Sequence, residues 1–229
     1  NVRQMSESFR FIHTASIKPI VKNNFNSILF LIPITTDPHY RIHIHIIFYQ
    51  GMKSELIENR IIVWSIEDSQ KLFSQGYYGK PIGIPKPKIE EIDAPLVLDL
   101  IEGLYLLKNK KITVNKLKKK ITVEELIEIG KKSYFDFENK YLVYKHFRDK
   151  GYIINPGIKF GCDFAVYEKG PGIDHSPYLI QVYGRNYTIP ATEITITGRL
   201  ASSVRKQFIF AIPKGKDKVD FLGLDWWKA

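Results

Sequence analysis

The sequence predicts an α+β N-terminal domain followed by an α/β domain built on a mixed sheet. Two changes in hydrophobic period along the chain support this fold class. Residues 27–65 contain runs of Ile, Phe and Val typical of strands, whereas residues 66–150 carry apolar residues at helical spacing between capping signals. From Tyr152 onward, short apolar runs separated by Gly and Pro predict strands again. A helix-rich, basic first part therefore precedes a mixed second part.

The predicted organisation has three segments: an N-terminal extension over residues 1–51, an α+β domain over 52–134 and the α/β domain over 135–229. Within the extension, residues 27–35 and 41–49 are rich in Ile and Phe. Asp37 and Pro38 lie between them and form a turn signal, because Pro presets φ and Asp caps turns. We expect a β-hairpin in this segment.

The α+β domain is expected to begin with a second hairpin, over residues 52–65. Ser65 and Asp68 resemble a capping box and predict a helix that ends near Gly76, and Thr122 with Glu125 forms a further capping box. Residues 79–88 are rich in Pro, Gly and Lys and predict a loop. The remaining helices are expected over residues 95–108, 113–119, 122–132 and 135–150.

The second domain is expected to carry its strands in short apolar runs. These runs lie at residues 152–154, 164–168, 178–183, 208–212 and 219–227, and a helical pattern covers residues 194–206.

The chain is basic, with 34 Lys and Arg against 24 Asp and Glu and a formal net charge of +10 at pH 7. This excess favours a polyanionic partner, because each phosphate that a cation neutralises releases counterions. A Lys-rich surface adapted to high temperature would have the same composition. Composition alone therefore does not separate a nucleic-acid-binding protein from a thermophilic one.

The single cysteine, Cys162, excludes an intramolecular disulfide and a cysteine-based zinc site. It fits a reducing, cytoplasmic compartment, and its apolar neighbours favour a small core residue over a nucleophile. The apolar runs at residues 27–34 and 42–49 are too short to cross a bilayer, and the N-terminus lacks the pattern of a signal peptide. We expect a soluble protein with no membrane partner.

Three side chains of the second domain could supply acid–base chemistry. Tyr167 ends a predicted strand, the Gly- and Pro-containing loop that follows carries His175, and Lys206 ends the predicted helix. Cleavage of a phosphodiester by the neighbouring 2′-hydroxyl needs a base, an acid and a cation near the phosphorane. A phenol, an imidazole and an ammonium group can meet these needs without a metal. From residue types and spacing alone, however, a packed Tyr and a solvated His explain the pattern better.

The flanking residues carry a resemblance to a known family. The segment at residues 141–152, the Lys-Phe-Gly-Cys-Asp-Phe run at 159–164, Gly170-Pro171 before His175-Ser176, and Ser-Val-Arg-Lys at 203–206 all match in order and spacing. Over roughly residues 52–227, the chain resembles the tRNA-splicing endonucleases. Among them it is most similar to the archaeal catalytic subunits, because these motifs are present. The resemblance implies a restriction-endonuclease-like fold for the second domain, which becomes the catalytic domain.

The resemblance also implies roles. Tyr167 would be the general base on the 2′-hydroxyl, His175 the general acid on the 5′ oxygen, and Lys206 the cation beside the phosphorane; no metal or cofactor is implied. The ordinary pKa of tyrosine is near 10, so a base role needs the nearby ammonium of Lys206 to favour the phenolate. The products would be a 2′,3′-cyclic phosphate and a 5′-hydroxyl at bulge–helix–bulge sites of precursor tRNA.

Base contacts are implied less completely. Arg199 stands where the family places an arginine that stacks on a bulged base. The second stacking arginine has no clear match, and Trp226 and Trp227 occupy that region, where an indole could stack on a base or pack in an interface.

Two departures from the family bear on partners. Self-assembling members dock an acidic loop on a partner, whereas the matching loop at residues 214–218 is basic here. This predicts a separate structural subunit and an α2β2 heterotetramer. Residues 84–93 resemble a loop of crenarchaeal catalytic subunits, where Lys86 and Lys88 would touch RNA phosphates, although a solvated, Pro-stiffened loop explains them equally well.

Two other functions remain open. A non-catalytic structural or RNA-binding subunit would share the fold, but such subunits lose the Tyr, His or Lys that this chain retains. A metal-dependent nuclease would use carboxylates such as Asp163 and Glu193, but no tight Asp…Glu-x-Lys pattern is present.

Overall fold

The computed structural model describes residues 27–31, 44–48, 51–85, 87–173, 175–215 and 218–224. The chain divides into two compact units, residues 1–50 and 51–229. In the first unit, strands β1 (Ser27–Leu31) and β2 (Ile44–Phe48) pair antiparallel, with Ser27 opposite Phe48. The expected turn between them lies outside the described residues.

The second unit begins with a six-stranded sheet in the order β5-β6-β4-β3-β7-β8. The β3–β4 hairpin turns at Glu58, whose φ is 51°, as the sequence predicts. β3 and β7 are parallel neighbours, and the other pairs are antiparallel. The strands are β3 (Met52–Ile57), β4 (Arg60–Val63), β5 (Lys80–Pro81), β6 (Leu96–Leu98), β7 (Ile112–Lys116) and β8 (Lys119–Lys120).

Two helix predictions in this domain need correction. The helix expected over residues 113–119 is wrong, because the chain forms β7 and β8 there, and Ile112 and Val114 alternate into the core. The helix expected over residues 95–108 is correct only in its second part. β6 precedes it, and helix α2 (Leu100–Lys108) starts after Asp99, whose carboxylate accepts from the Ile101 N–H at 2.9 Å.

The other helices follow their capping signals. Helix α1 (Ile66–Gly76) begins where the Ser65 hydroxyl accepts from the Asp68 N–H at 3.2 Å. Helix α3 (Val123–Ser133) has a complete capping box between Thr122 and Glu125. Helix α4 (Phe137–Asp149) is followed by Gly151 at φ 87°, the left-handed conformation that glycine adopts readily after a helix.

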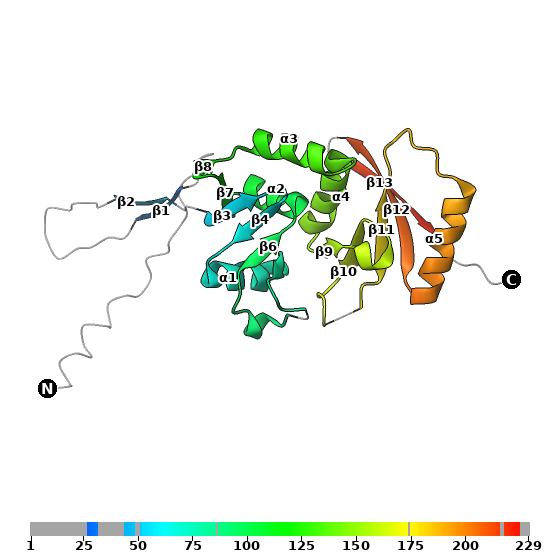
Figure 1. Ribbon diagram of the computed structural model, residues 1–229, viewed down its shortest axis with the longest axis horizontal. Helices are drawn as coiled ribbons and strands as arrows, with labels where there is room; N and C mark the ends of the chain where they lie inside the picture. Colours follow the sequence, from blue (N-terminus) through cyan, green and yellow to red (C-terminus); the bar gives the residue numbers. More distant parts are fainter. Residues whose placement is uncertain are drawn as a thin grey trace, which may run out of the picture. The chain divides into compact units, whose positions relative to one another are not determined.

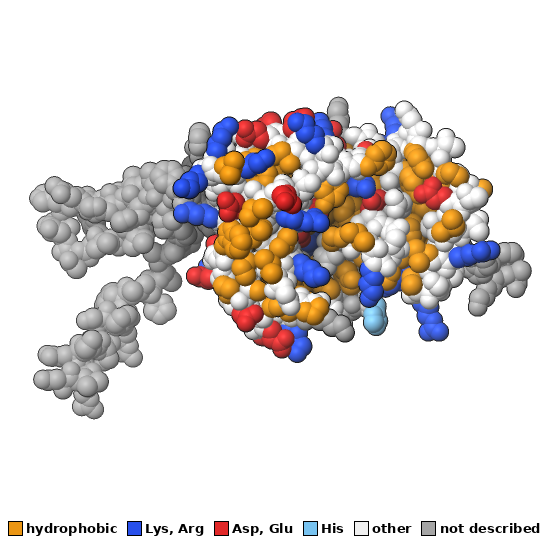
Figure 2. Space-filling model, in the orientation of Figure 1, with side chains coloured by type: hydrophobic (Ala, Val, Ile, Leu, Met, Phe, Trp, Pro, Cys, Tyr) orange, Lys and Arg blue, Asp and Glu red, His pale blue; other side chains and the backbone are white. Residues whose placement is uncertain are grey.

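One face of the six-stranded sheet carries the core of this domain. Ile61, Leu98 and Val114 on this face are fully buried. On the opposite face, apolar side chains remain partly exposed and gather over β3, β4 and β6 (Figure 2), among them Ile57 and Trp64. The domain core therefore lies between the sheet and its helices, on one side only.

The other sheet of this unit, in the predicted α/β domain, has five strands in the order β13-β12-β11-β10-β9. β11 and β12 are parallel and the other pairs antiparallel, so the predicted mixed sheet is confirmed. Helices α4 and α5 lie on opposite sides of it (Figure 1). The elements are β9 (Ile153–Pro156), the 3-10 turn η2 (Ile158–Phe160), β10 (Phe164–Tyr167), β11 (Tyr178–Val182), α5 (Ala191–Val204), β12 (Gln207–Gly215) and β13 (Lys218–Leu224).

A buried guanidinium joins the two sheets. Arg148 of α4 donates to the Gly76 carbonyl at 2.6 Å, to the Tyr144 hydroxyl at 2.9 Å and to the Ile154 carbonyl at 3.3 Å. It also lies 3.5 Å from the buried carboxylate of Glu102 on α2. Burial raises the pKa of Glu102 to about 7, although the neighbouring Arg148 charge acts in the opposite direction.

This pKa predicts that stability falls as pH rises from 4.5 to about 7. In that window the folded protein holds a proton on Glu102 that the unfolded chain, with its ordinary carboxyl pKa, has released. Glu102→Gln cannot titrate, so its free energy of unfolding should lose this component of the pH dependence. Urea unfolding between pH 4.5 and 7.5 measures the difference, at about 1.4 kcal/mol per pH unit for one full proton.

The matched control is Glu90→Gln, since Glu90 is exposed to solvent. It should keep the slope of the natural protein. A Glu102→Gln variant with that same slope would contradict the assignment.

Candidate active site

The strand register brings three strand ends together. Val166 of β10 lies opposite Tyr178 of β11, and Tyr178 lies beside Gln207 of β12. One residue further along, Tyr167 ends β10 and Lys206 immediately precedes β12. Tyr167 and Lys206 therefore flank the end of the loop that carries His175, at one end of the sheet.

Lys206 is anchored to that loop. Its ammonium group donates to the main-chain carbonyl of Ser176, the residue after His175. Ser176 is buried, and its hydroxyl donates to the Tyr178 carbonyl at 3.0 Å, which fixes the loop where it enters β11. The imidazole of His175 is exposed beside this anchor. Lys206 is therefore hydrogen-bonded to the residue that directly follows His175.

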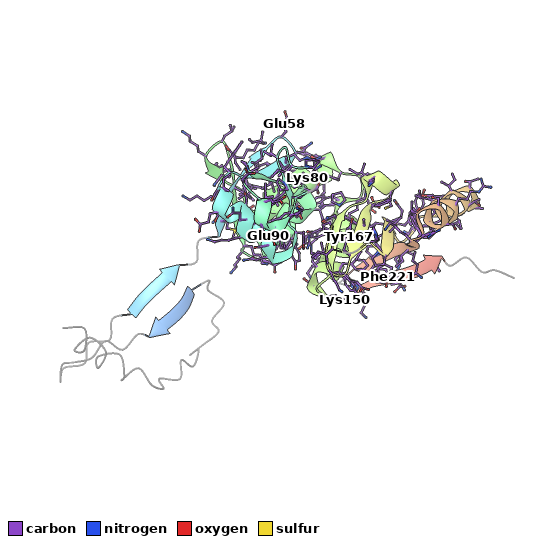
Figure 3. All side chains as sticks on the ribbon, turned by 90° about the horizontal axis from the view of Figure 1, so that it is seen from below. Glu58, Lys80, Glu90, Lys150, Tyr167 and Phe221 are labelled. Atoms are coloured by element: carbon purple, nitrogen blue, oxygen red, sulfur yellow. The ribbon has the colours of Figure 1, made fainter. Side chains whose placement is uncertain are left out.

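Tyr167 lies in the sheet itself, as Figure 3 shows. Successive side chains of a strand alternate between faces, so Tyr167 shares a face with Ala165. On that face, Ala201 of α5 and Phe208 of β12 belong to one apolar cluster, and Tyr167 is half-buried against it. The phenol thus stands on the α5 side, at the strand end nearest Lys206.

Two further features surround the Lys206 ammonium. It lies 5.3 Å from the centroid of the Phe160 ring, within the range of a cation–π contact. Partial burial, and after it the positive charge of Lys159, lowers the pKa of Lys206. Sequence reasoning did not single out Phe160 or Lys159 as contributors to the site, because η2 is distant from Lys206 along the chain.

The loop after Tyr167 packs against Tyr77, a residue of the α+β domain (residues 52–134). Gly170 adopts φ 135°, and a Cβ built there would lie 2.6 Å from the ring of Tyr77. Tyr77 follows α1 with φ 54°, and its buried ring packs edge-on against Phe73 at 5.1 Å. The position requires glycine because the backbone conformation and the close ring both exclude a side chain.

The carboxylates considered for metal chemistry are engaged elsewhere. Asp163 pairs with Lys140 at 2.7 Å and accepts from the Val182 N–H at 2.8 Å. Glu193 accepts from the hydroxyls of Tyr183 and Tyr187. Within the described ranges, no group of three or more His, Cys, Asp or Glu is placed to hold a metal ion.

Cys162 is a core residue, as expected. Its buried thiol lies 3.4 Å from the Phe164 carbonyl oxygen, and burial raises its pKa to about 11. A thiol with so high a pKa is a poor nucleophile at neutral pH.

The structure does not bring the expected RNA-binding residues together at one place. Arg199 is exposed on α5, the helix that leads to Lys206. Lys88 precedes the 3-10 turn η1 (Ile89–Glu91) and pairs with Glu91 at 2.9 Å. The remaining three, Lys86, Trp226 and Trp227, lie outside the described residues.

A groove of about 900 Å³ runs where the two domains of the second unit meet. Charged residues of both signs line it, with Arg60 paired to Asp99 and Lys140 paired to Asp163, together with apolar residues such as Ile82. Pro171, from the loop that carries His175, also contributes to its wall. The groove is therefore continuous with the base of this loop.

Comparison with known proteins places both domains in one class of enzyme. Residues 137–221 match the model for the catalytic C-terminal domain of the tRNA intron endonuclease, and residues 52–127 match the model for its N-terminal domain. The class is thus a two-domain endonuclease, with the candidate site inside its catalytic domain.

Relatives of nearly the same length as residues 52–229 make the family explicit. The tRNA-splicing endonuclease of Sulfurisphaera tokodaii is 42% identical over 179 residues, which cover 77% of this chain and 99% of that protein. Those of Hyperthermus butylicus and Pyrobaculum islandicum are each 41% identical, over 77% of this chain and 99% and 100% of their own lengths. The chain belongs to the tRNA-splicing endonuclease family, as its motifs predict. In the described residues, no helix is long and apolar enough to span a bilayer.

The contact between Gly170 and Tyr77 gives a testable prediction. Gly170→Ala should lower the free energy of unfolding by roughly 1–3 kcal/mol, because the new methyl group meets a buried ring and the backbone is strained. Gly172→Ala is the matched control, since Gly172 has φ 89° but no heavy atom within 4 Å of its built Cβ. Urea unfolding should show a larger loss for Gly170→Ala; equal losses would mean that Tyr77 does not constrain the loop.

Proposed function

We propose that this chain is the catalytic subunit of a tRNA-splicing endonuclease and cuts precursor tRNA at bulge–helix–bulge splice sites. The observation that carries the proposal is the bond from the Lys206 ammonium to the Ser176 carbonyl, beside His175 and at the strand end of Tyr167. This bond holds the Lys206 ammonium on the loop that carries His175, and the register puts the end of Tyr167's strand at the same end of the sheet. Cytoplasmic location follows from the tRNA substrate.

In the proposed reaction, Tyr167 takes the proton of the 2′-hydroxyl as its oxygen attacks the adjacent phosphorus. The bond from phosphorus to the 5′ oxygen then breaks, and His175 gives its proton to that departing oxygen. The Lys206 ammonium stabilises the charge on the phosphorane between these steps. The cut RNA chain therefore leaves one fragment with a 2′,3′-cyclic phosphate end and the other with a 5′-hydroxyl end. No atom is supplied by a cofactor.

Substrate contacts are proposed around this centre. Arg199 is exposed on α5 and can stack its guanidinium on a bulged base. Trp226 and Trp227 are proposed to provide the second stacking surface, and Lys86 and Lys88 to contact phosphates. The ion pair of Lys88 with Glu91 is exposed, so exchanging Glu91 for a phosphate costs little.

A structural subunit is the proposed protein partner, in an α2β2 assembly. Lys214, in an ion pair with Asp220, and Lys218 lie on either side of the β12–β13 connection. The basic sequence of this connection suits an acidic partner rather than a second copy of the same loop.

The catalytic assignment is tested by cleavage of a bulge–helix–bulge RNA. His175→Ala and Lys206→Ala should each lower kcat by roughly 10²–10⁴-fold, the usual contribution of a positioned acid or charge. The natural protein should remain active in EDTA and leave 2′,3′-cyclic phosphate ends.

The alternatives give different results. Full cleavage by His175→Ala would indicate a non-catalytic role for this chain in the complex. Loss of activity in EDTA, restored by Mg²⁺, would indicate a metal-dependent nuclease.

The assembly is tested by co-expression with a candidate structural subunit. Light scattering after gel filtration should report two copies of each chain, and cleavage should require both. A stable, active homotetramer of this chain would contradict the proposed α2β2 form.

A further inference from the structure

We propose that Lys159 and Lys206 form a two-cation site for consecutive phosphates of one RNA strand, with the ring of Phe160 holding both ammonium groups in place. Lys206 meets the scissile phosphate, and Lys159 meets its neighbour. The proposal rests on the proposed function, which supplies the RNA, and adds a substrate-binding residue and a positioning residue to it.

The first support is the shape of the η2 segment. The Gly157 N–H donates to the Asp163 carbonyl at 2.9 Å, so residues 157–163 form a closed loop between β9 and β10. Cys162 fills the loop, since a Cβ on Gly157 would lie 2.5 Å from its sulfur. This packing fixes η2, and with it the adjacent Lys159 and Phe160, on the domain framework.

The second support is the position of the Phe160 ring. The ring is half-buried against the cluster of Ala165, Leu179 and Phe208, on the face of the sheet that α5 covers. Its centroid lies 5.3 Å from the Lys206 nitrogen and 5.9 Å from the Lys159 nitrogen. Both distances are within the roughly 6 Å range of cation–π attraction. The Lys206 ammonium is therefore held at two points, by the Ser176 carbonyl and by this ring.

The third support is charge. Among the residues that the structure describes, neither Lys159 nor Lys206 pairs with a carboxylate. Partial burial lowers the pKa of Lys206, and the repulsion between the two ammonium groups on this ring lowers it further. A polyanion relieves the repulsion by placing a negative charge on each ammonium group. The RNA backbone offers such charges in sequence along one strand.

The arrangement divides the roles of the three residues. Lys159 is exposed and acts through binding, so its loss should weaken RNA affinity more than turnover. Phe160 acts through Lys206, so its loss should lower turnover while RNA affinity changes little. Lys206 belongs to both the binding site and the chemistry.

The test uses a bulge–helix–bulge RNA with 2′-deoxy sugars at the two cleavage positions, which can bind but cannot be cut. Fluorescence anisotropy measures Kd against salt, with the full chain in the assembly in which the natural protein binds. Lys159→Ala should reduce the slope of log K against log salt by about 0.7–0.9, the value for one phosphate contact. Lys159→Arg should restore the slope.

Lys150→Ala is the control of equal charge. Lys150 is exposed at the end of α4, on the other side of the sheet from α5, and Figure 3 labels it apart from Tyr167. Its removal should leave the slope unchanged. A Lys159→Ala slope equal to that of Lys150→Ala, with cleavage by the natural protein intact, would overturn this inference alone.

The positioning role of Phe160 is tested with cleavable RNA. Phe160→Leu should lower kcat roughly three- to thirtyfold with little change in KM, and Phe160→Tyr, which keeps the ring, should retain activity. Thermal unfolding of both variants checks that the apolar cluster is intact. An unchanged kcat in folded Phe160→Leu would overturn this role. A natural protein that neither binds nor cuts the RNA would overturn the proposed function, and this inference with it.

Discussion

The buried guanidinium of Arg148 contacts the end of α1, a carboxylate of α2 and strand β9 at the same time. It satisfies the Gly76 carbonyl at the end of α1 and the Ile154 carbonyl in β9, and it is the positive charge beside the buried Glu102. Each of these groups would be costly to leave unpaired in the interior. Without the Arg148 charge, which lowers the pKa of Glu102, this buried carboxyl group would hold its proton to a still higher pH. Arg148 therefore adds polar contacts between α1, α2 and β9 to the hydrophobic cluster that the two domains share.

The same interaction extends toward the proposed chemistry. Gly76 immediately precedes Tyr77, so the bond from Arg148 fixes the end of α1 that carries the Tyr77 ring. That ring is the surface against which Gly170 closes the loop of His175. The first domain thus shapes the active-site loop without contributing a reacting group. This gives a physical reason for two domains to stay together in an enzyme whose proposed acid, base and cation all lie in one of them.

Local signals in the sequence predict the helices well and the strands less well. The capping residues Ser65 and Thr122 mark helix starts because the hydrogen bonds involved close within three residues. The helix predicted over residues 113–119 is wrong because its Lys-rich sequence has good helix formers, whereas pairing of Ile112 with Met52 on β3 decides the structure. Residue types and motifs were enough to nominate Tyr167, His175 and Lys206. Phe160, Lys159 and Tyr77 could not be found in that way, because their contacts join segments distant in sequence.

The surroundings of Lys206 show how a polar site can be prepared before its ligand arrives. A fully solvated lysine would have to lose water and side-chain freedom as a phosphorane forms. Here the Ser176 carbonyl and the Phe160 ring already restrict the ammonium, and partial burial has already removed part of its hydration. The repulsion from Lys159 opposes this arrangement in the free protein and disappears when anions arrive. Binding of two consecutive RNA phosphates therefore removes the repulsion between Lys159 and Lys206, and this relief adds to the affinity for RNA.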